Sequence, residues 1–198
     1  MCQTSSFEGD TELDDIETQR RRSFMEGWDV LRSKRLAKQK RMGLVPHNTK
    51  LTARPKNIPA WASLSKKKQN EMDAIMATYA GMIDRVDQNI GKLVHHLEQT
   101  GELDNTIIFF LSDNGGEAET GALGQFQFKN LGIYGKGGNK YGKGWASLSN
   151  TPFREYKHFA HQGGIQTPLI VHWPSGILNN TPNRILSQFG YLPDLSLI

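Results

Sequence analysis

Several features that would narrow the class of this chain are scarce or missing. Its 198 residues include one cysteine, Cys2, so no disulfide can form within the chain and cysteine usage indicates no redox compartment. No apolar run approaches the roughly 18 residues that a membrane span needs, and the early acids Glu8, Asp10 and Glu12 do not fit a signal peptide. The net charge is only +4, from 24 basic and 20 acidic residues, which by itself does not argue for nucleic acid. The composition therefore predicts a globular chain with no membrane span and no indicated compartment.

The first third of the chain carries a basic segment, residues 20–41, RRRSFMEGWDVLRSKRLAKQKR. We expect a helix here, with Trp28, Leu31 and Leu36 along one apolar edge and the Lys and Arg residues in solvent. Nucleic-acid binding is the alternative, but the segment lacks interleaved aromatic side chains and any known reading motif. The prolines between residues 45 and 63 then predict an irregular connection.

The clearest periodicity lies between residues 72 and 97. Apolar side chains recur there at spacings of three and four, which predicts one long amphipathic helix. Ser65 is the expected N-cap and Gly101 the expected stop signal. A short turn then leads into the predicted strand Thr106–Leu111, so we expect this helix to pack against a sheet.

The predicted strand Thr106–Leu111 is followed by Ser-Asp-Asn-Gly-Gly. A short apolar run between turn signals is typical of a strand buried on both faces, usually in a parallel sheet covered by helices. Ligands of such sheets bind at the carboxyl ends of the strands, which makes Asp113 and Asn114 candidate site residues. Asp-Asn-Gly is also a good turn sequence, and these residues alone leave both interpretations open.

Residues 115–146 are rich in Gly, Asn and Lys and predict a long loop over the sheet. Within this loop, GGNKYGKG resembles a phosphate-binding loop, but Gly144 stands where a Ser or Thr must hold magnesium, so we reject a nucleotide site. A second strand is predicted at Leu169–His172, between two prolines. We expect His158 and His161, just before it, to be structural.

Two ordered stretches, LDNTIIFFLSDNGG and GWASLSNTPFREYKHFAHQGGIQTPLIVHWPSGI, resemble the sulfatase family and its arylsulfatase-type enzymes. The helical segment YAGMIDRVDQNIGKLVHHLEQTGELDNT and the upstream GWDVLRSKRLAKQKRMGLVPHNTKL fit the same family in the same order. The resemblance extends from about Gly27 to Asp194. It rests on several motifs rather than on one short pattern.

This resemblance implies an alkaline-phosphatase-like α/β sandwich, with a mainly parallel sheet flanked by helices, that hydrolyses sulfate esters of aryl groups or glycans. The family uses Ca²⁺ and a formylglycine made from a Cys or Ser. By resemblance, Asp113 and Asn114 are calcium ligands and Lys157 is the active-site lysine that contacts the sulfate. The chemistry of these groups agrees, because carboxylate and amide oxygens suit Ca²⁺ and an ammonium can stabilise charge on a sulfate.

The chain also departs from the family pattern. Gln162 stands where the family usually has Glu, and the chain has no Cys/Ser-x-Pro-x-Arg motif, since the sequence around Cys2 lacks the Pro and Arg. The family's N-terminal acid pair and the upstream His and Lys of its pocket are absent too.

We therefore interpret residues 1–198 as a partial sulfatase catalytic domain, cut at both ends and stopping inside RILSQFGYLPDLSLI. Residues 1–64 would form the basic helix and connection, and residues 65–198 the helix-strand core with the calcium-site and lysine motifs. We expect the isolated chain to be inactive; the alternative is a non-catalytic remnant that binds a cation or a partner. Related enzymes are often periplasmic, secreted or lysosomal, and the sequence does not choose among these.

Overall fold

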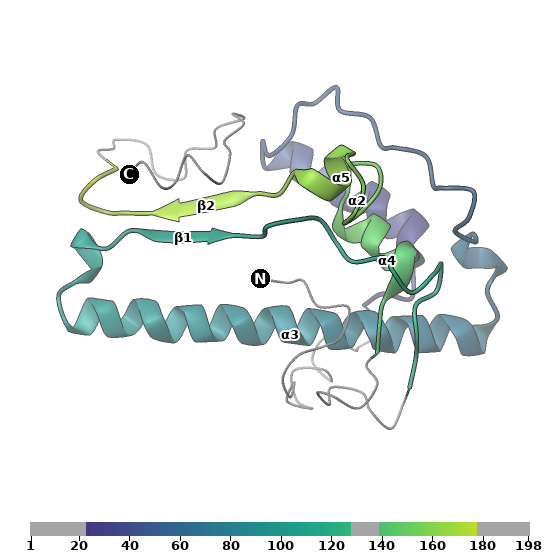
Figure 1. Ribbon diagram of the computed structural model, residues 1–198, viewed down its shortest axis with the longest axis horizontal. Helices are drawn as coiled ribbons and strands as arrows, with labels where there is room; N and C mark the ends of the chain where they lie inside the picture. Colours follow the sequence, from purple (N-terminus) through teal and green to yellow (C-terminus); the bar gives the residue numbers. More distant parts are fainter. Residues whose placement is uncertain (1–22, 128–138, 178–198) are drawn as a thin grey trace.

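The computed structural model describes residues 23–127 and 139–177. In chain order, its elements are α2 (Gly27–Arg41), η1 (Trp61–Ser63), α3 (Lys66–Gln99), η2 (Leu103–Asn105), β1 (Ile108–Leu111), α4 (Gly142–Ser149), α5 (Gln162–Ile165) and β2 (Leu169–His172). Helices α2, α4 and α5 gather around the N-terminal half of α3, and the β1–β2 pair runs beside its C-terminal half (Figure 1). Among the described residues, no helix is both long and apolar enough to cross a bilayer.

Helix α3 confirms the predicted amphipathic helix and both of its boundaries. The Ser65 hydroxyl oxygen accepts a hydrogen bond from the Lys68 amide at 3.3 Å and so satisfies one free donor of the first turn. At the other end Gly101 has a φ of +73°, a left-handed conformation that costs glycine little. The Glu102 amide then donates to the Leu97 carbonyl at 2.9 Å, which closes the last turn.

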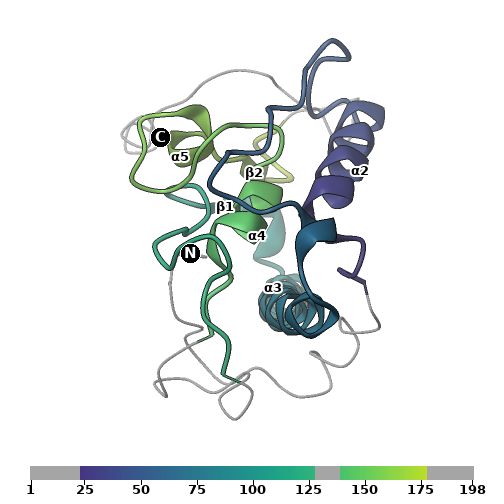
Figure 2. The same cartoon turned by 90° about the vertical axis from the view of Figure 1, so that its right-hand side faces the viewer.

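Three tryptophans form the centre of the core. Trp28 of α2, Trp61 of η1 and Trp145 of α4 have ring centroids 4.9–5.4 Å apart, at edge-on or tilted angles. Each indole N–H is paired with a backbone carbonyl, as in the 3.0 Å bond from Trp145 to Met72 of α3, so the rings are buried without an unpaired donor. Figure 2 looks along α3 and shows α2 and α4 on one side of it. The core therefore joins the basic N-terminal helix to the rest of the chain.

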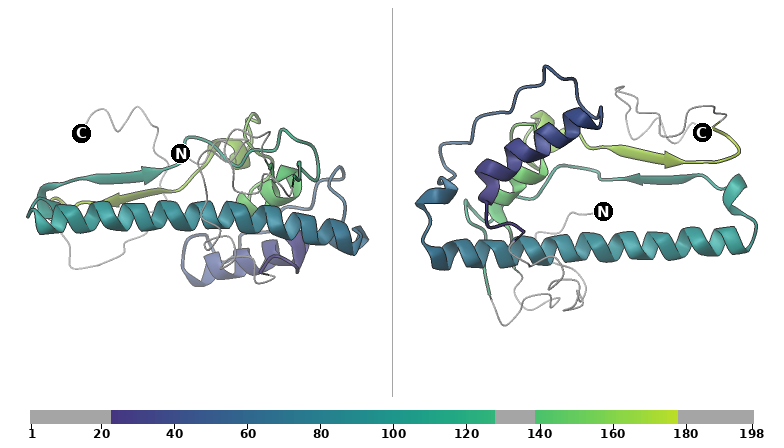
Figure 3. Two further views of the ribbon diagram at one scale, coloured as in Figure 1. Left: turned by 90° about the horizontal axis from the view of Figure 1, so that it is seen from below. Right: turned by 180° about the vertical axis from the view of Figure 1, so that it is seen from behind.

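The predicted packing of the long helix against the sheet is only loose among the described residues. The N-terminal half of α3 is buried through Met72, Ile75 and Met76, but further along Ile83 and Leu93 are 41% and 52% exposed. Strand β2 is exposed along its whole length. Figure 3 shows the β1–β2 pair and the C-terminal half of α3 extending together away from the core. Two short strands offer too little apolar area to bury the stripe of so long a helix.

The two predicted strands are present, β2 with the expected bounds, but they pair antiparallel. Ile108 lies opposite His172 and Leu111 opposite Leu169. The parallel arrangement and the burial of β1 on both faces are therefore wrong for this pair. The antiparallel pairing has a consequence for the site, because it brings the residues that enter β2 beside the residues that leave β1.

The N-terminal helix is confirmed from Gly27, with Trp28 and Leu36 of the expected apolar edge buried, but Arg32, which was expected in solvent, is only 4% exposed. The long loop predicted for residues 115–146 is interrupted: α4 begins at Gly142, and an isolated bridge pairs Gln125 with Lys140. The apolar end of the chain and Cys2 lie outside the described residues.

Candidate functional site

The Ser-Asp-Asn-Gly-Gly segment leaves the carboxyl end of β1 as a tight turn. The Ser112 hydroxyl donates to the Asn114 carbonyl oxygen at 3.0 Å, which closes the turn from inside. The Thr167 hydroxyl, just before β2, donates to the Ser112 carbonyl oxygen. Because the strands are antiparallel, the predicted site residues after β1 and the segment before β2 meet at one end of the pair.

Two backbone hydrogen bonds join this turn to the segment that carries Lys157. The Gly115 amide donates to the Gly164 carbonyl at 3.0 Å, and the Lys157 amide donates to the Gly116 carbonyl at 3.1 Å. The contact at Gly115 is so close that a Cβ there would lie 1.7 Å from the Gly163 oxygen. Only a glycine allows this approach, so the two motifs quoted from the sequence form one assembly.

Asn150 braces the same assembly, although no sequence motif singled it out. Its side-chain oxygen accepts from the Gly116 amide at 2.9 Å, and its side-chain nitrogen donates to the Glu155 carbonyl at 2.9 Å. The side-chain amide of Asn150 therefore pairs with the Gly116 N–H in the turn after β1 and with the Glu155 carbonyl in the segment that carries Lys157. The available signal was its place in SNTPFREYK, directly before the lysine segment.

Asp113 and Asn114 lie side by side, with the Asn114 amide donating to the Asp113 carboxylate at 2.9 Å. Asp113 is exposed, whereas the Asn114 side-chain oxygen is buried and has no hydrogen-bond partner among the described residues. A buried acceptor without a partner is costly, and a hard cation is one group that would satisfy it. The donor set therefore fits Ca²⁺ as two of its ligands. In the described residues no group of three or more His, Cys, Asp or Glu side chains completes such a site.

Glu117 follows this turn in the sequence, and it is buried, with only 2% of its surface exposed. One of its carboxylate oxygens accepts from the Glu119 amide, and the other has no partner among the described residues. Burial raises the pKa of Glu117, partly offset by that hydrogen bond and by the charges of Lys140 and Lys157. The Lys157 ammonium is therefore close enough to influence this carboxylate.

Glu119 differs from Glu117 in being exposed and paired with the imidazole of His158. The hydrogen bond from His158 lowers the pKa of Glu119. His158 itself has a φ of +75°, and Glu155 one of +65°. Non-glycine residues in this region carry backbone strain, which proteins concentrate at functional sites. Lys157 therefore lies, half-buried, between two strained positions.

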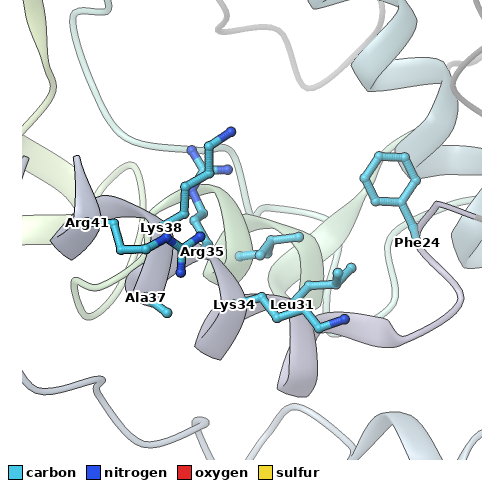
Figure 4. A pocket seen from close by; sticks show the side chains of 8 residues that line it. Phe24, Leu31, Lys34, Arg35, Ala37, Lys38 and Arg41 are labelled. Carbon is cyan, nitrogen blue, oxygen red and sulfur yellow. The ribbon is translucent and has the colours of Figure 1, made fainter.

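A hollow of about 460 Å³ lies along α2 (Figure 4), and no residue of the assembly around Gly115 lines it. We call it the α2 hollow; its lining combines apolar side chains with four cations, Lys34, Arg35, Lys38 and Arg41. Lys34 is paired with Glu26 at 2.5 Å, and the indole of Trp28 is buried and not available for stacking on a base. That nucleic acid is not a partner stays a prediction.

Comparison with known proteins gives one consistent family. A family model described as Sulfatase matches residues 10–195. The chain is 34% identical over 196 residues to an uncharacterized sulfatase of Schizosaccharomyces pombe, covering 87% of this chain and 33% of that protein. It is 32% identical over 163 residues to an arylsulfatase of Klebsiella aerogenes, covering 76% of this chain and 34% of that protein.

A third relative is an N-acetylgalactosamine-6-O-sulfatase of Bacteroides thetaiotaomicron, 28% identical over 128 residues, which cover 62% of this chain and 21% of that protein. The chain thus spans about a third of the length of the first two relatives. The family model matches nearly the whole chain, and it includes both motifs of the assembly around Gly115. The chain belongs to the sulfatase family.

Proposed function

We propose that this chain is the part of a sulfatase catalytic domain that supplies two calcium ligands and the sulfate-contacting lysine, and that the whole domain hydrolyses sulfate esters. The observation that carries the proposal is the pair of backbone hydrogen bonds from Gly115 to Gly164 and from Lys157 to Gly116. These bonds fix the lysine segment against the turn that holds Asp113 and Asn114. A sulfate ester between them would meet an ammonium on one side and a cation site on the other.

Each residue has a separate task in this proposal. Asp113 and Asn114 would hold Ca²⁺ through a carboxylate oxygen and the unpaired amide oxygen of Asn114. When bound, Ca²⁺ would supply positive charge close to the sulfate oxygens. Lys157 would bind a sulfate oxygen and stabilise the negative charge that develops on it during ester cleavage. Asn150 is a positioning residue, because it acts on the backbone of both motifs and not on the substrate.

The nucleophile would come from outside this chain, which has no Cys/Ser-x-Pro-x-Arg motif. A formylglycine there would supply the oxygen that attacks sulfur, in keeping with the family. We therefore expect the 198-residue chain alone to show no turnover of an aryl sulfate such as nitrocatechol sulfate, because the group that forms the covalent intermediate is missing. Saturable hydrolysis by the purified chain would refute this division of roles.

The test of the proposed roles uses a full-length sulfatase that carries this segment. Asp113→Ala should lower both calcium occupancy and kcat, with partial rescue by added calcium. Lys157→Ala should leave calcium occupancy unchanged and lower kcat by about 10²-fold or more. Lys92→Ala is the matched control, because Lys92 is exposed on α3. Near-normal kcat in Lys157→Ala, or normal calcium occupancy in Asp113→Ala, would remove that residue from the site.

A second candidate function is a non-catalytic module that binds a partner. The exposed apolar side chains of β2 and of the C-terminal half of α3 favour it, Ile170 being 59% exposed and Leu93 52%. An activity assay of the full-length protein distinguishes the two functions. A protein with intact Asp113 and Lys157 that shows no turnover would favour the binding module.

A further inference from the structure

A second hollow, of about 270 Å³, lies between the connection that follows α2 and the segment that carries Lys157. We call it the cationic hollow. It is lined by three basic side chains, Lys50, Arg154 and His161, together with the polar side chains of Thr49, Thr52 and Gln162. No acidic side chain lines it. None of the residues assigned to calcium or sulfate above belongs to it.

The lining is held in place by contacts from both sides. The Thr52 hydroxyl donates to the Pro152 carbonyl at 3.0 Å and accepts from the Arg32 guanidinium at 2.9 Å. Arg32 is itself only 4% exposed, so this side of the hollow is anchored in the interior. Because the Thr52 hydroxyl is already used as donor and acceptor, it is a brace and not a ligand group.

The other side of the hollow is closed by a tight backbone contact. The Gly163 amide donates to the Arg154 carbonyl at 2.9 Å, and a Cβ on Gly163 would lie 2.1 Å from the Glu155 oxygen. This contact brings Arg154 next to His161 and Gln162 although they are apart in sequence. The same segment is bonded to the Gly116 carbonyl through the Lys157 amide. One segment, residues 152–164, therefore lines the hollow and also carries Lys157.

The charges in the hollow are only partly compensated. The Arg154 guanidinium approaches the Glu155 carboxylate at 3.4 Å, a long and exposed contact, which contributes little. For the Lys50 ammonium the structure records no hydrogen bond or ion pair within the described residues. Apart from Thr52, the hollow is thus lined by two permanent cations, a histidine, the Thr49 hydroxyl and the Gln162 amide, and all of these groups can donate hydrogen bonds.

We propose that the cationic hollow binds a second anionic group of the substrate, a sulfate or a carboxylate carried on a sugar ring. Its volume lies just below the range of about 300–1,000 Å³ typical of sites for drug-sized ligands, so it suits one charged group with its ring and not an extended ligand. Binding of the anion rests on the hollow alone. The statement that this anion belongs to the substrate rests on the proposed function, and it makes the substrate a sulfated glycan with at least two anions.

The experiment measures binding to the full 198-residue chain by calorimetry, so it needs no turnover. The probes are three disaccharides with one backbone: one with two sulfates, one with a sulfate and a carboxylate, and one uncharged. We expect both charged probes to bind and the uncharged one not to bind. Tighter binding of the probe with a carboxylate identifies the anion as carboxylate, whereas equal binding or tighter binding of the disulfated probe identifies it as sulfate, because both probes carry a sulfate. Equal binding of the uncharged probe, or no binding of either charged probe at millimolar concentration, overturns the proposal.

Variants locate the binding. Lys50→Ala and Arg154→Gln should each weaken the charged probes about tenfold, the usual effect of losing one charge-assisted hydrogen bond. Lys56→Ala, on the same connection but outside the hollow, and Arg41→Ala, in the α2 hollow, should bind as the parent does. Unchanged affinity in Lys50→Ala and Arg154→Gln, or an equal loss in Arg41→Ala, refutes the assignment.

Lys157→Ala separates this proposal from the proposed function. If Lys157→Ala in the full-length protein keeps its activity, the role of that lysine fails. Tenfold losses in Lys50→Ala and Arg154→Gln on the isolated chain would still establish the hollow as an anion site. Conversely, a loss of activity in Lys157→Ala with unchanged binding in the two hollow variants would leave the sulfatase roles intact and overturn the subsite.

Discussion

The amide of Lys157 donates to the carbonyl of Gly116 at 3.1 Å. Together with the bond from the Gly115 amide to the Gly164 carbonyl, it connects the two stretches of sequence that resemble sulfatase motifs, one after β1 and one before β2. Close to Lys157 in sequence, Glu155 and His158 both hold left-handed backbone conformations. Backbone contacts and backbone conformation therefore position the lysine. Changes to the backbone of the Gly115–Gly116 turn should therefore be transmitted to Lys157.

The first prediction concerns Asn150, which holds both sides of this assembly. Asn150→Ala would leave the Gly116 amide and the Glu155 carbonyl without their partner, and we expect the free energy of unfolding to fall by about 1–3 kcal/mol. Urea denaturation of the 198-residue chain measures this change. Asn89→Ala is the matched control, because Asn89 is exposed on α3, and it should stay within about 0.5 kcal/mol of the parent. Equal stability of the two variants would contradict the bracing role.

The second prediction uses the opposite pKa shifts of Glu117 and Glu119. Burial raises the pKa of Glu117 in the folded state, so its contribution is fully favourable below the pKa of the unfolded chain, about 4.3, and is lost as pH rises through the folded pKa. Glu117→Gln should therefore become more stable relative to the parent as pH rises from about 4 to about 7.

Glu119 gives the control with the opposite sign. Its pKa is lowered by the hydrogen bond with His158, so its contribution is present above the unfolded pKa and is lost as pH falls through the folded one. Glu119→Gln should be less stable than the parent near neutral pH, with a difference that shrinks in acid. Unfolding curves at several pH values measure both differences. The same pH trend in the two variants would show that burial does not set the state of Glu117.

The third prediction concerns calcium and the isolated chain. Asp113 and Asn114 provide two side-chain ligands, whereas Ca²⁺ takes about six to eight oxygens. We therefore expect the 198-residue chain to bind Ca²⁺ no more tightly than about millimolar, with this binding lost in Asp113→Ala and kept in Asp87→Ala, an exposed acid on α3. Calorimetry with calcium chloride is the measurement. Micromolar affinity would mean that other residues of this chain complete the site, Glu117 first among them because one of its oxygens is unpaired.

The sequence predicted the local elements better than it predicted their assembly. Helix α3, its caps and strand β2 followed from periodicity and end signals, which are local properties. The direction of strand pairing depends on contacts between distant residues, and no spacing within β1 reports it. Exposure of the C-terminal half of α3 was missed for the same reason, because an amphipathic stripe predicts a buried face but not which surface covers it.

The candidate site shows the same difference between local sequence signals and contacts between distant residues. Asp113, Asn114 and Lys157 stand out because they belong to recognisable motifs, and their roles stay predictions. Asn150 belongs to no such motif, since its bracing contacts are visible only when Gly116 and Glu155 are seen on either side of it. Helix α4 was hidden by the glycines Gly142 and Gly144, which read as loop residues. Gly144 is needed there for another reason: a Cβ would meet the ring of Trp28 at 2.8 Å.

The last prediction tests the closest contact of the site. Gly115→Ala would put a methyl group 1.7 Å from the Gly163 carbonyl oxygen, and because the obstacle is backbone, no side chain can move aside. The two motifs would have to separate, with loss of the hydrogen bond from Gly115 to Gly164. We expect the free energy of unfolding to fall by about 3 kcal/mol, measured by urea denaturation.

Gly91→Ala is the matched control, since Gly91 lies within α3 and a Cβ there meets nothing within 4 Å. This variant should be more stable than the parent by about 0.5–1 kcal/mol, because alanine loses less backbone freedom in a helix than glycine does. A loss of stability in Gly115→Ala together with a gain in Gly91→Ala would separate the effect of steric contact from the effect of helix propensity. If Gly115→Ala unfolded at the same urea concentration as the parent, the segment around Lys157 could move without cost, and the backbone positioning proposed for that lysine would be wrong.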